Sequence, residues 1–200
     1  MPKSKIIPVK EKLYAKYMET FNHCKRVARM SYILGVAYGL SEEEARELEV
    51  VAPFHDIGKV GLSEILLYKS DKLTAEEYEK IKMHTVIGFE LLSISKKPIV
   101  QKAAIVSLQH HERWDGHGYP NRLKEYEIDL FARITSIIDV FDALKSSRVY
   151  KGAWEIHDTI EYIKDESGDM FEPKLVSLLE ENLEAILNVY EIDKIENNQK

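Results

Sequence analysis

The stretch HHERWDGHGYP, residues 110–120, joins two adjacent histidines to a glycine-rich loop. The residues before it place apolar side chains on one helix face in line with His110: Ile99, Ala103 and Val106. The pattern therefore predicts a helix over about 98–110 that ends in imidazoles. Such an ending belongs either to a His-rich surface turn or to a metal site, and the rest of the chain decides between them.

Helical patterns recur along the remaining sequence, and alternating strand patterns are scarce. Two pairs have the capping-box spacing that begins a helix: Ser41 with Glu44, and Thr74 with Glu77. We expect further helices over about 11–38, 41–55, 74–95, 129–144, 153–165 and 173–190. The sequence therefore predicts an all-α domain.

Composition narrows the class of protein. The 200-residue chain has 28 Lys and Arg against 34 Asp and Glu, a net charge of -6, so DNA and RNA are not expected partners. A single cysteine, Cys24, excludes a disulfide framework and a thiolate zinc cluster, and fits a reducing cytoplasm. No apolar run is long enough to span a bilayer, so we expect a cytoplasmic protein without membrane association.

Five histidines and two aspartates occupy inward or helix-end positions of the predicted helices: His23, His55, Asp56, His84, His110, His111 and Asp139. One inward histidine is most often a hydrogen-bonded core residue, and a buried carboxylate without a partner is costly. A shared positive centre would satisfy all seven side chains together. Nitrogen and oxygen ligands suit Fe, Mn or Zn, and this many ligands predicts two or more ions, about 3.5–4 Å apart. Such ions lower the pKa of bound water from about 15.7 to about 7, which makes hydroxide available at neutral pH.

Two motifs carry a family resemblance. HDIGKVG at 55–61, together with the stretch at 110–120, resembles the HD-GYP family, a branch of the HD-domain metal-dependent phosphohydrolases. The intervening segments also follow the family order: LTAEEYEKIKMHTVIGFELL at 73–92, ARITSIIDVFDAL at 132–144, RVYK at 148–151 and GDMFEP at 168–173. The resemblance covers about residues 19–175. It implies an HD-domain helical bundle whose glycine-rich GYP loop lies beside the metal site.

The resemblance also implies an activity. Family members hydrolyse cyclic di-GMP to pGpG and often to GMP through a metal-activated hydroxide. They use two or three divalent ions, with iron preferred here and manganese or zinc as alternatives. Carried over by position, the seven side chains above are the ligands, with Asp56 between two ions. Glu19, four residues before His23, corresponds to the ligand of a third ion.

The phosphate contacts follow from the same resemblance. Lys59 completes HDIGK; it would face a phosphate oxygen and act in catalysis with Asp56. Arg148 and Lys151 in RVYK would lie near the other phosphate contacts of the dianionic dinucleotide. Tyr119 either packs the loop or approaches a base. In the family, glycines are common at two positions that here hold other residues, Arg122 and Glu125.

Three readings stay open: a cyclic di-GMP phosphodiesterase, a phosphohydrolase acting on another cyclic dinucleotide, and a non-catalytic adaptor that binds nucleotide or protein. A protein partner at the GYP loop and a homodimer are also left open. We expect a helical lead-in at 1–18, the catalytic domain at 19–190 and a polar tail at 191–200.

Overall fold

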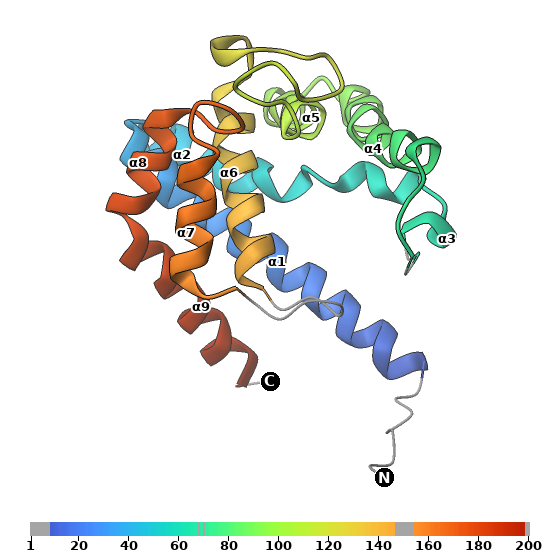
Figure 1. Ribbon diagram of the computed structural model, residues 1–200, viewed down its shortest axis with the longest axis horizontal. Helices are drawn as coiled ribbons and strands as arrows, with labels where there is room; N and C mark the ends of the chain where they lie inside the picture. Colours follow the sequence, from blue (N-terminus) through green and yellow to red (C-terminus); the bar gives the residue numbers. More distant parts are fainter. Residues whose placement is uncertain (1–8, 68, 70, 147–153, 199–200) are drawn as a thin grey trace.

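The computed structural model of the chain describes residues 9–67, 69, 71–146 and 154–198. Across these ranges the chain forms nine α-helices, three short 3₁₀ helices and an isolated bridge between Ser167 and Phe171, with no strand (Figure 1). The α-helices are α1 Val9–Tyr38, α2 Glu42–Val51, α3 Glu64–Leu67, α4 Ala75–Ser93, α5 Pro98–Gln109, α6 Leu130–Lys145, α7 Ile156–Asp165, α8 Pro173–Glu181 and α9 Leu183–Asn198; the 3₁₀ helices are η1 Ala52–Phe54, η2 Ile57–Gly61 and η3 Glu125–Glu127. The all-α prediction is confirmed.

Both predicted capping boxes are present. The Ser41 hydroxyl accepts from the amide of Glu44, and the Glu44 carboxylate accepts from the amide of Ser41 at 2.9 Å. Thr74 and Glu77 bind each other in the same way. These bonds satisfy amides that the first turn of a helix leaves unpaired, so α2 and α4 begin where the sequence predicted.

Two predicted helices differ from the structure, one at its end and one by a break in its interior. The helix expected over 41–55 stops at Val51 and continues as η1, because Pro53 has no N–H to donate to the preceding turn. The helix expected over 173–190 is two helices, divided at Asn182, whose side chain donates to the carbonyl of Leu178 at 2.8 Å. The expected polar tail is helical as far as Asn198. Since α1 and α9 run across positions 18 and 190, the division into 1–18, 19–190 and 191–200 remains a proposal.

The core lies between α1, α6 and the C-terminal helices, while α4 and α5 pack together on the other side (Figure 1). α6 is buried on almost every side and contacts both α1 and α5. The largest wholly buried apolar side chains include Met30, Leu34, Ile134, Ile137 and Phe141. α6 therefore lies between the part formed by α1 and the C-terminal helices and the part formed by α4 and α5. None of the helices in the described ranges has both the length and the apolarity that crossing a membrane requires.

At Gly58, η2 lies in direct backbone contact with α4. A methyl group added at Gly58 would overlap the backbone of His84 and lie 2.5 Å from the amide nitrogen of Gly88. Only a residue without a Cβ permits this approach. Gly58 thereby fixes the distance between the HD motif and the middle of α4.

Candidate metal centre

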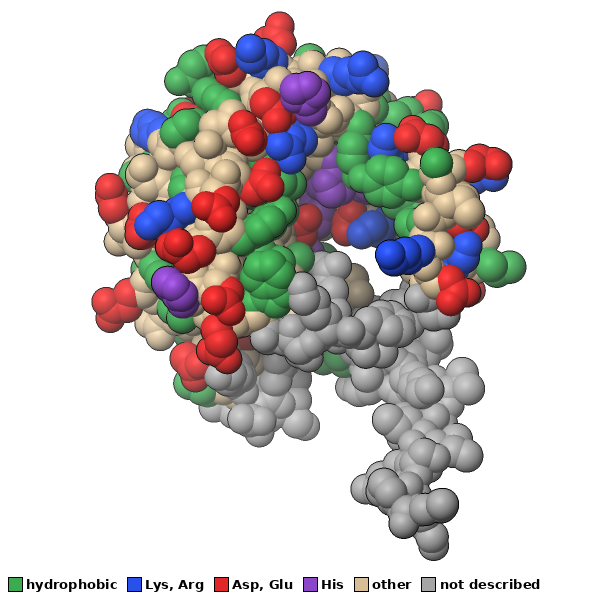
Figure 2. Space-filling view, in the orientation of Figure 1, with side chains coloured by type: hydrophobic (Ala, Val, Ile, Leu, Met, Phe, Trp, Pro, Cys, Tyr) green, Lys and Arg blue, Asp and Glu red, His purple; other side chains and the backbone are tan. Residues whose placement is uncertain are grey.

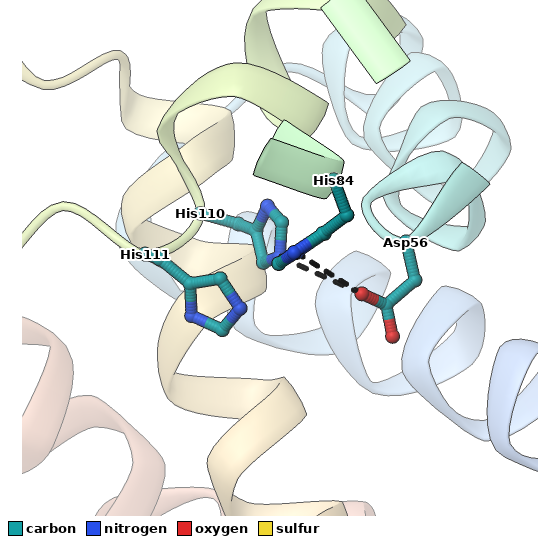
Figure 3. A group of neighbouring side chains, drawn as sticks. All are labelled: Asp56, His84, His110 and His111. Carbon is teal, nitrogen blue, oxygen red and sulfur yellow. Dashed lines mark hydrogen bonds and ion pairs between the residues drawn. The ribbon is translucent and has the colours of Figure 1, made fainter. Parts of the chain in front are cut away.

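The structure brings seven of the eight predicted ligand side chains into two adjoining groups. We call the first the His23 group (His23, His55 and Asp139) and the second the His84 group (Asp56, His84, His110 and His111). Within each group, one possible ligand atom per residue lies within 4.8 Å of the others. Figure 3 shows the His84 group, in which the Asp56 carboxylate points toward the imidazoles. Separate elements supply these side chains, as the sequence predicted, and the two groups could hold divalent ions.

Asp56 lies between the two groups. Its Oδ2 is 3.4 Å from Nε2 of His55, and its Oδ1 is 3.4 Å from Nε2 of His84 and 3.9 Å from Nε2 of His110. Oδ1 is buried and has no hydrogen-bond partner among the described residues. A buried carboxylate oxygen without a partner is unfavourable in a folded protein, and a cation at this position would remove the penalty.

Local hydrogen bonds fix the rings of three histidines. In each case Nδ1 donates to the backbone carbonyl three residues earlier: His55 to Ala52 at 2.8 Å, His84 to Ile81 at 2.7 Å and His110 to Ser107 at 3.0 Å. A carbonyl only accepts, so the proton of a neutral ring is on Nδ1 and the lone pair is on Nε2. All three Nε2 atoms point into the centre.

The Nε2 atoms are closely packed. Those of His23 and His55 are 3.4 Å apart, and those of His84 and His110 are 3.3 Å apart. Two bare lone pairs at this distance repel each other unless a proton or a cation lies between them. Together with the unpartnered oxygen of Asp56, this donor set fits divalent cations.

The histidines of the centre differ in the direction in which their pKa values are shifted. Burial lowers the pKa of His84 and His110, and it lowers that of His111 to about 4, so these rings are neutral. Burial acts in the same direction on His55, but the carboxylates of Asp56 and Asp139 outweigh it and raise the pKa of His55 to about 9. A metal ion would compete with that proton, because a histidine ligand must be neutral.

The ring of His23 is held by a residue that we did not identify from the sequence. Its Nδ1 is 2.8 Å from Oδ2 of Asp142, and its Nε2 is 3.4 Å from Oδ1 of Asp139. Burial acts to raise the pKa of Asp142, but hydrogen bonds from Arg26 and His23 lower it to about 2. A signal was available, since DVFD places a second carboxylate one turn after Asp139 in an apolar helix.

The other predicted site residues lie in different places. The ammonium group of Lys59 makes a close ion pair with Oδ2 of Asp56 at the surface of the centre. The ring of Tyr119 lies 4.8 Å from that of His111, so it borders the His84 group. Glu19 belongs to neither group. Arg148 and Lys151 lie outside the described residues. Figure 2 shows histidine, acidic and basic side chains together in a hollow of this face.

The loop that follows the two histidines is anchored at both ends. The buried carboxylate of Glu112 accepts from the amides of Asn121 at 2.7 Å and Leu123 at 3.1 Å. The Tyr119 amide donates to the His111 carbonyl at 3.1 Å, which ties the loop to a predicted ligand. Arg122 and Glu125 both have positive φ, 58° and 52°. This explains why glycine suits these two positions.

The chain is similar in sequence and in fold to known proteins. The HD domain family matches residues 8–175. A "Cyclic di-GMP phosphodiesterase" of Thermotoga maritima is 41% identical over 90% of this chain and 49% of its own length. A "3'3'-cGAMP-specific phosphodiesterase 2" of Vibrio cholerae is 41% identical over 88% of this chain and 34% of its own length. The chain thus spans half or less of the length of these relatives.

A solved structure has the same fold. The HDG"Y"P protein of Bdellovibrio bacteriovorus superposes with a TM-score of 0.64 at 21% identity, over 81% of this chain and 51% of that one. The fold, the family match and the paired motifs lead to one assignment. The chain belongs to the HD-domain family, within the HD-GYP branch.

Proposed function

We propose that this chain is a metal-dependent phosphodiesterase that hydrolyses cyclic di-GMP to pGpG, GMP or both. The observation that carries the proposal is the pair of adjoining ligand groups with Asp56 between them. Two ions on either side of a shared carboxylate are the arrangement that hydrolyses phosphodiesters in many unrelated enzymes. The name of the Thermotoga maritima relative supports the choice of substrate.

The side chains would divide between the ions as the two groups do. The His23 group would hold one ion and the three histidines of the His84 group the other, with Asp56 shared. Bound ions would supply Lewis acidity and lower the pKa of water from about 15.7 to about 7. We propose iron as the preferred metal, with manganese or zinc as alternatives, and Glu19 as the ligand of a third ion.

The chain's own groups would bind and orient the substrate. The side chain of Lys59 is 45% exposed and borders Asp56, so it can turn to an incoming phosphate and stabilise the charge that develops on it. Tyr119 would pack against the bound nucleotide from its place beside His111. Arg148 and Lys151 would contact the second phosphate. A cytoplasmic location, a protein partner at the GYP loop and a homodimer remain part of the proposal.

A second substrate has a specific observation in its favour. The Vibrio cholerae relative named for 3'3'-cGAMP has the same 41% identity as the one named for cyclic di-GMP. The two dinucleotides share the phosphodiester ring and differ in one base. Recognition of the bases, and not the metal chemistry, would therefore decide between them.

The experiment that tests the proposal is anaerobic turnover of both dinucleotides. Purified protein is assayed with Fe(II), with Mn(II) or without added metal, products are separated by chromatography, and bound metal is measured by elemental analysis. We expect metal-dependent pGpG or GMP. A protein that binds two ions yet leaves both dinucleotides intact would contradict the proposal and favour the adaptor reading.

A further inference from the structure

The C-terminal helix α9 lies beyond the HD-domain match, which ends at residue 175. It nevertheless packs against α1, the helix that carries His23. Two of its side chains, Tyr190 and Asp193, reach polar groups in the interior. The helix therefore does more than cover an apolar face.

The link between α9 and the metal centre is the carboxylate of Asp142. This residue is 1% exposed and uses both oxygens. Oδ2 accepts from Nδ1 of His23 at 2.8 Å and from Nη2 of Arg26 at 2.9 Å. Oδ1 accepts from Nε of Arg26 at 2.6 Å and from the Tyr190 hydroxyl at 2.8 Å. One buried carboxylate thus connects the imidazole, the guanidinium and the phenol.

Asp193 holds the other side of the guanidinium. Its Oδ2 accepts from Nη1 of Arg26 at 3.1 Å, and its Oδ1 is 3.3 Å from Nζ of Lys25. The guanidinium also lies 5.3 Å from the centre of the Tyr190 ring. Separating buried charges that are paired this closely costs free energy, because each charge is then left in the interior without an opposite charge beside it. α9 therefore fixes the position of Arg26 and, through it, that of Asp142.

His23 differs in this respect from three other histidines of the centre. Those three donate from Nδ1 to a carbonyl three residues earlier, so their own helical turns orient them. His23 donates to a carboxylate 119 residues away along the chain. The orientation of its ring thus depends on how α6 and α9 pack against α1.

We propose that Asp142, Tyr190 and Asp193 are positioning residues for the His23 group, and that α9 thereby sets the metal affinity of that group and not of the His84 group. This inference rests on the metal centre of the proposed function. Partners of this kind hold a histidine ligand in one tautomer and orientation, and their loss weakens metal binding. The His84 group has no contact of this kind with α9 among the described residues.

The test compares Tyr190→Phe with a matched control, Tyr38→Phe. The Tyr38 hydroxyl also donates to a buried carboxylate, that of Glu172, which is paired with Arg133. This pair does not contact the predicted metal ligands. Each full-length variant is titrated with Mn(II) against a chelator, and bound metal is counted by elemental analysis. The His23→Ala variant identifies which step of the titration belongs to the His23 group.

We expect Tyr190→Phe to weaken the step assigned to the His23 group about fivefold, the effect of one lost hydrogen bond, and to leave the other step unchanged. Tyr38→Phe should leave both steps unchanged. Asp142→Asn should weaken the same step about 10- to 100-fold. Since the amide NH₂ of asparagine can donate to Nδ1, this variant should also let the neutral His23 ring carry its proton on Nε2, a change of tautomer that two-bond 1H–15N spectra of the metal-free protein report.

Equal Mn(II) affinities in Tyr190→Phe and the wild-type protein would overturn the inference. So would an equal weakening of both steps, which would mean that α9 supports the fold in general. A wild-type protein that binds no Mn(II) would instead remove the proposed metal centre itself, and the two failures are thereby distinguished.

Discussion

Replacing Gly58 with alanine tests whether the HD motif depends on direct backbone contact with α4. The added Cβ would overlap the His84 carbonyl and lie 2.5 Å from the Gly88 nitrogen, whereas ordinary contact begins at 3.4 Å. The nearest contact, with the His84 carbonyl oxygen, is 1.9 Å, so η2 would have to move by about 1.5 Å to restore ordinary contact. A misplacement of about 1 Å can lower turnover about 100-fold. Overpacking of this kind costs about 1–3 kcal/mol of stability. We expect both effects, measured by turnover of cyclic di-GMP and by chemical denaturation.

The matched control is Gly61→Ala, in the same 3₁₀ helix. There the new methyl group would meet Cγ2 of Ile87 at 2.8 Å, and its three nearest neighbours are all side-chain atoms, so a smaller shift than at Gly58 relieves the contact. Gly61→Ala should therefore keep most of its turnover and bound metal. If Gly58→Ala matched Gly61→Ala in turnover, stability and metal content, the backbone contact would not position Asp56, and the reasoning would be refuted.

Three further predictions follow from the site and its loop. His55→Ala should abolish turnover and keep the helical circular dichroism, while His157→Ala, at an exposed position, should change neither; full turnover in His55→Ala would exclude the metal mechanism. Glu125→Gly should raise the free energy of unfolding by about 1 kcal/mol, because a side chain at φ 52° is strained; a loss of stability in denaturation would contradict this. Burial acts to raise the pKa of Asp115, but hydrogen bonds from Arg113 and the His117 amide lower it to about 2. Because this pKa is lower in the folded than in the unfolded state, the ionised carboxylate stabilises the fold above about pH 4, and this stabilisation is lost as the pH falls toward 2. Denaturation of the wild-type protein should therefore give a higher free energy of unfolding at pH 6 than at pH 3. Asp115→Asn should reduce that difference by on the order of 1 kcal/mol, a figure discounted for solvent screening.

The sequence predicted what local patterns encode. Helical spacing, two capping boxes and the polar residues on apolar faces were enough for an all-α fold and for the seven side chains that the structure brings together. The errors lie where a single residue interrupts a pattern. Pro53 ends α2 early, and Asn182 separates α8 from α9, although the apolar spacing continues past both positions.

Contacts between distant segments could not be predicted in the same way. No spacing rule relates Tyr190 to Asp142, 48 residues apart, or Asp193 to Arg26, 167 residues apart. Both contacts depend on how α9 packs against α1 and α6. Asp193 lies in the segment 191–200, which has the composition of a polar tail, so composition alone gave no reason to place it against α1.

The same distinction bears on how the centre tolerates change. His55, His84 and His110 are oriented by carbonyls within their own helical turns, so the orientation of these rings does not depend on α9. His23 is oriented by a carboxylate whose charge is balanced by Arg26, which gives the ring an acceptor without adding net negative charge beside Asp139. The pair of Asp142 and Arg26 can orient the His23 ring only while both side chains keep their positions. Side chains of α9, a helix that lies beyond the family match, hold them there. Variation in the C-terminal helix should therefore alter the His23 group before it alters the His84 group.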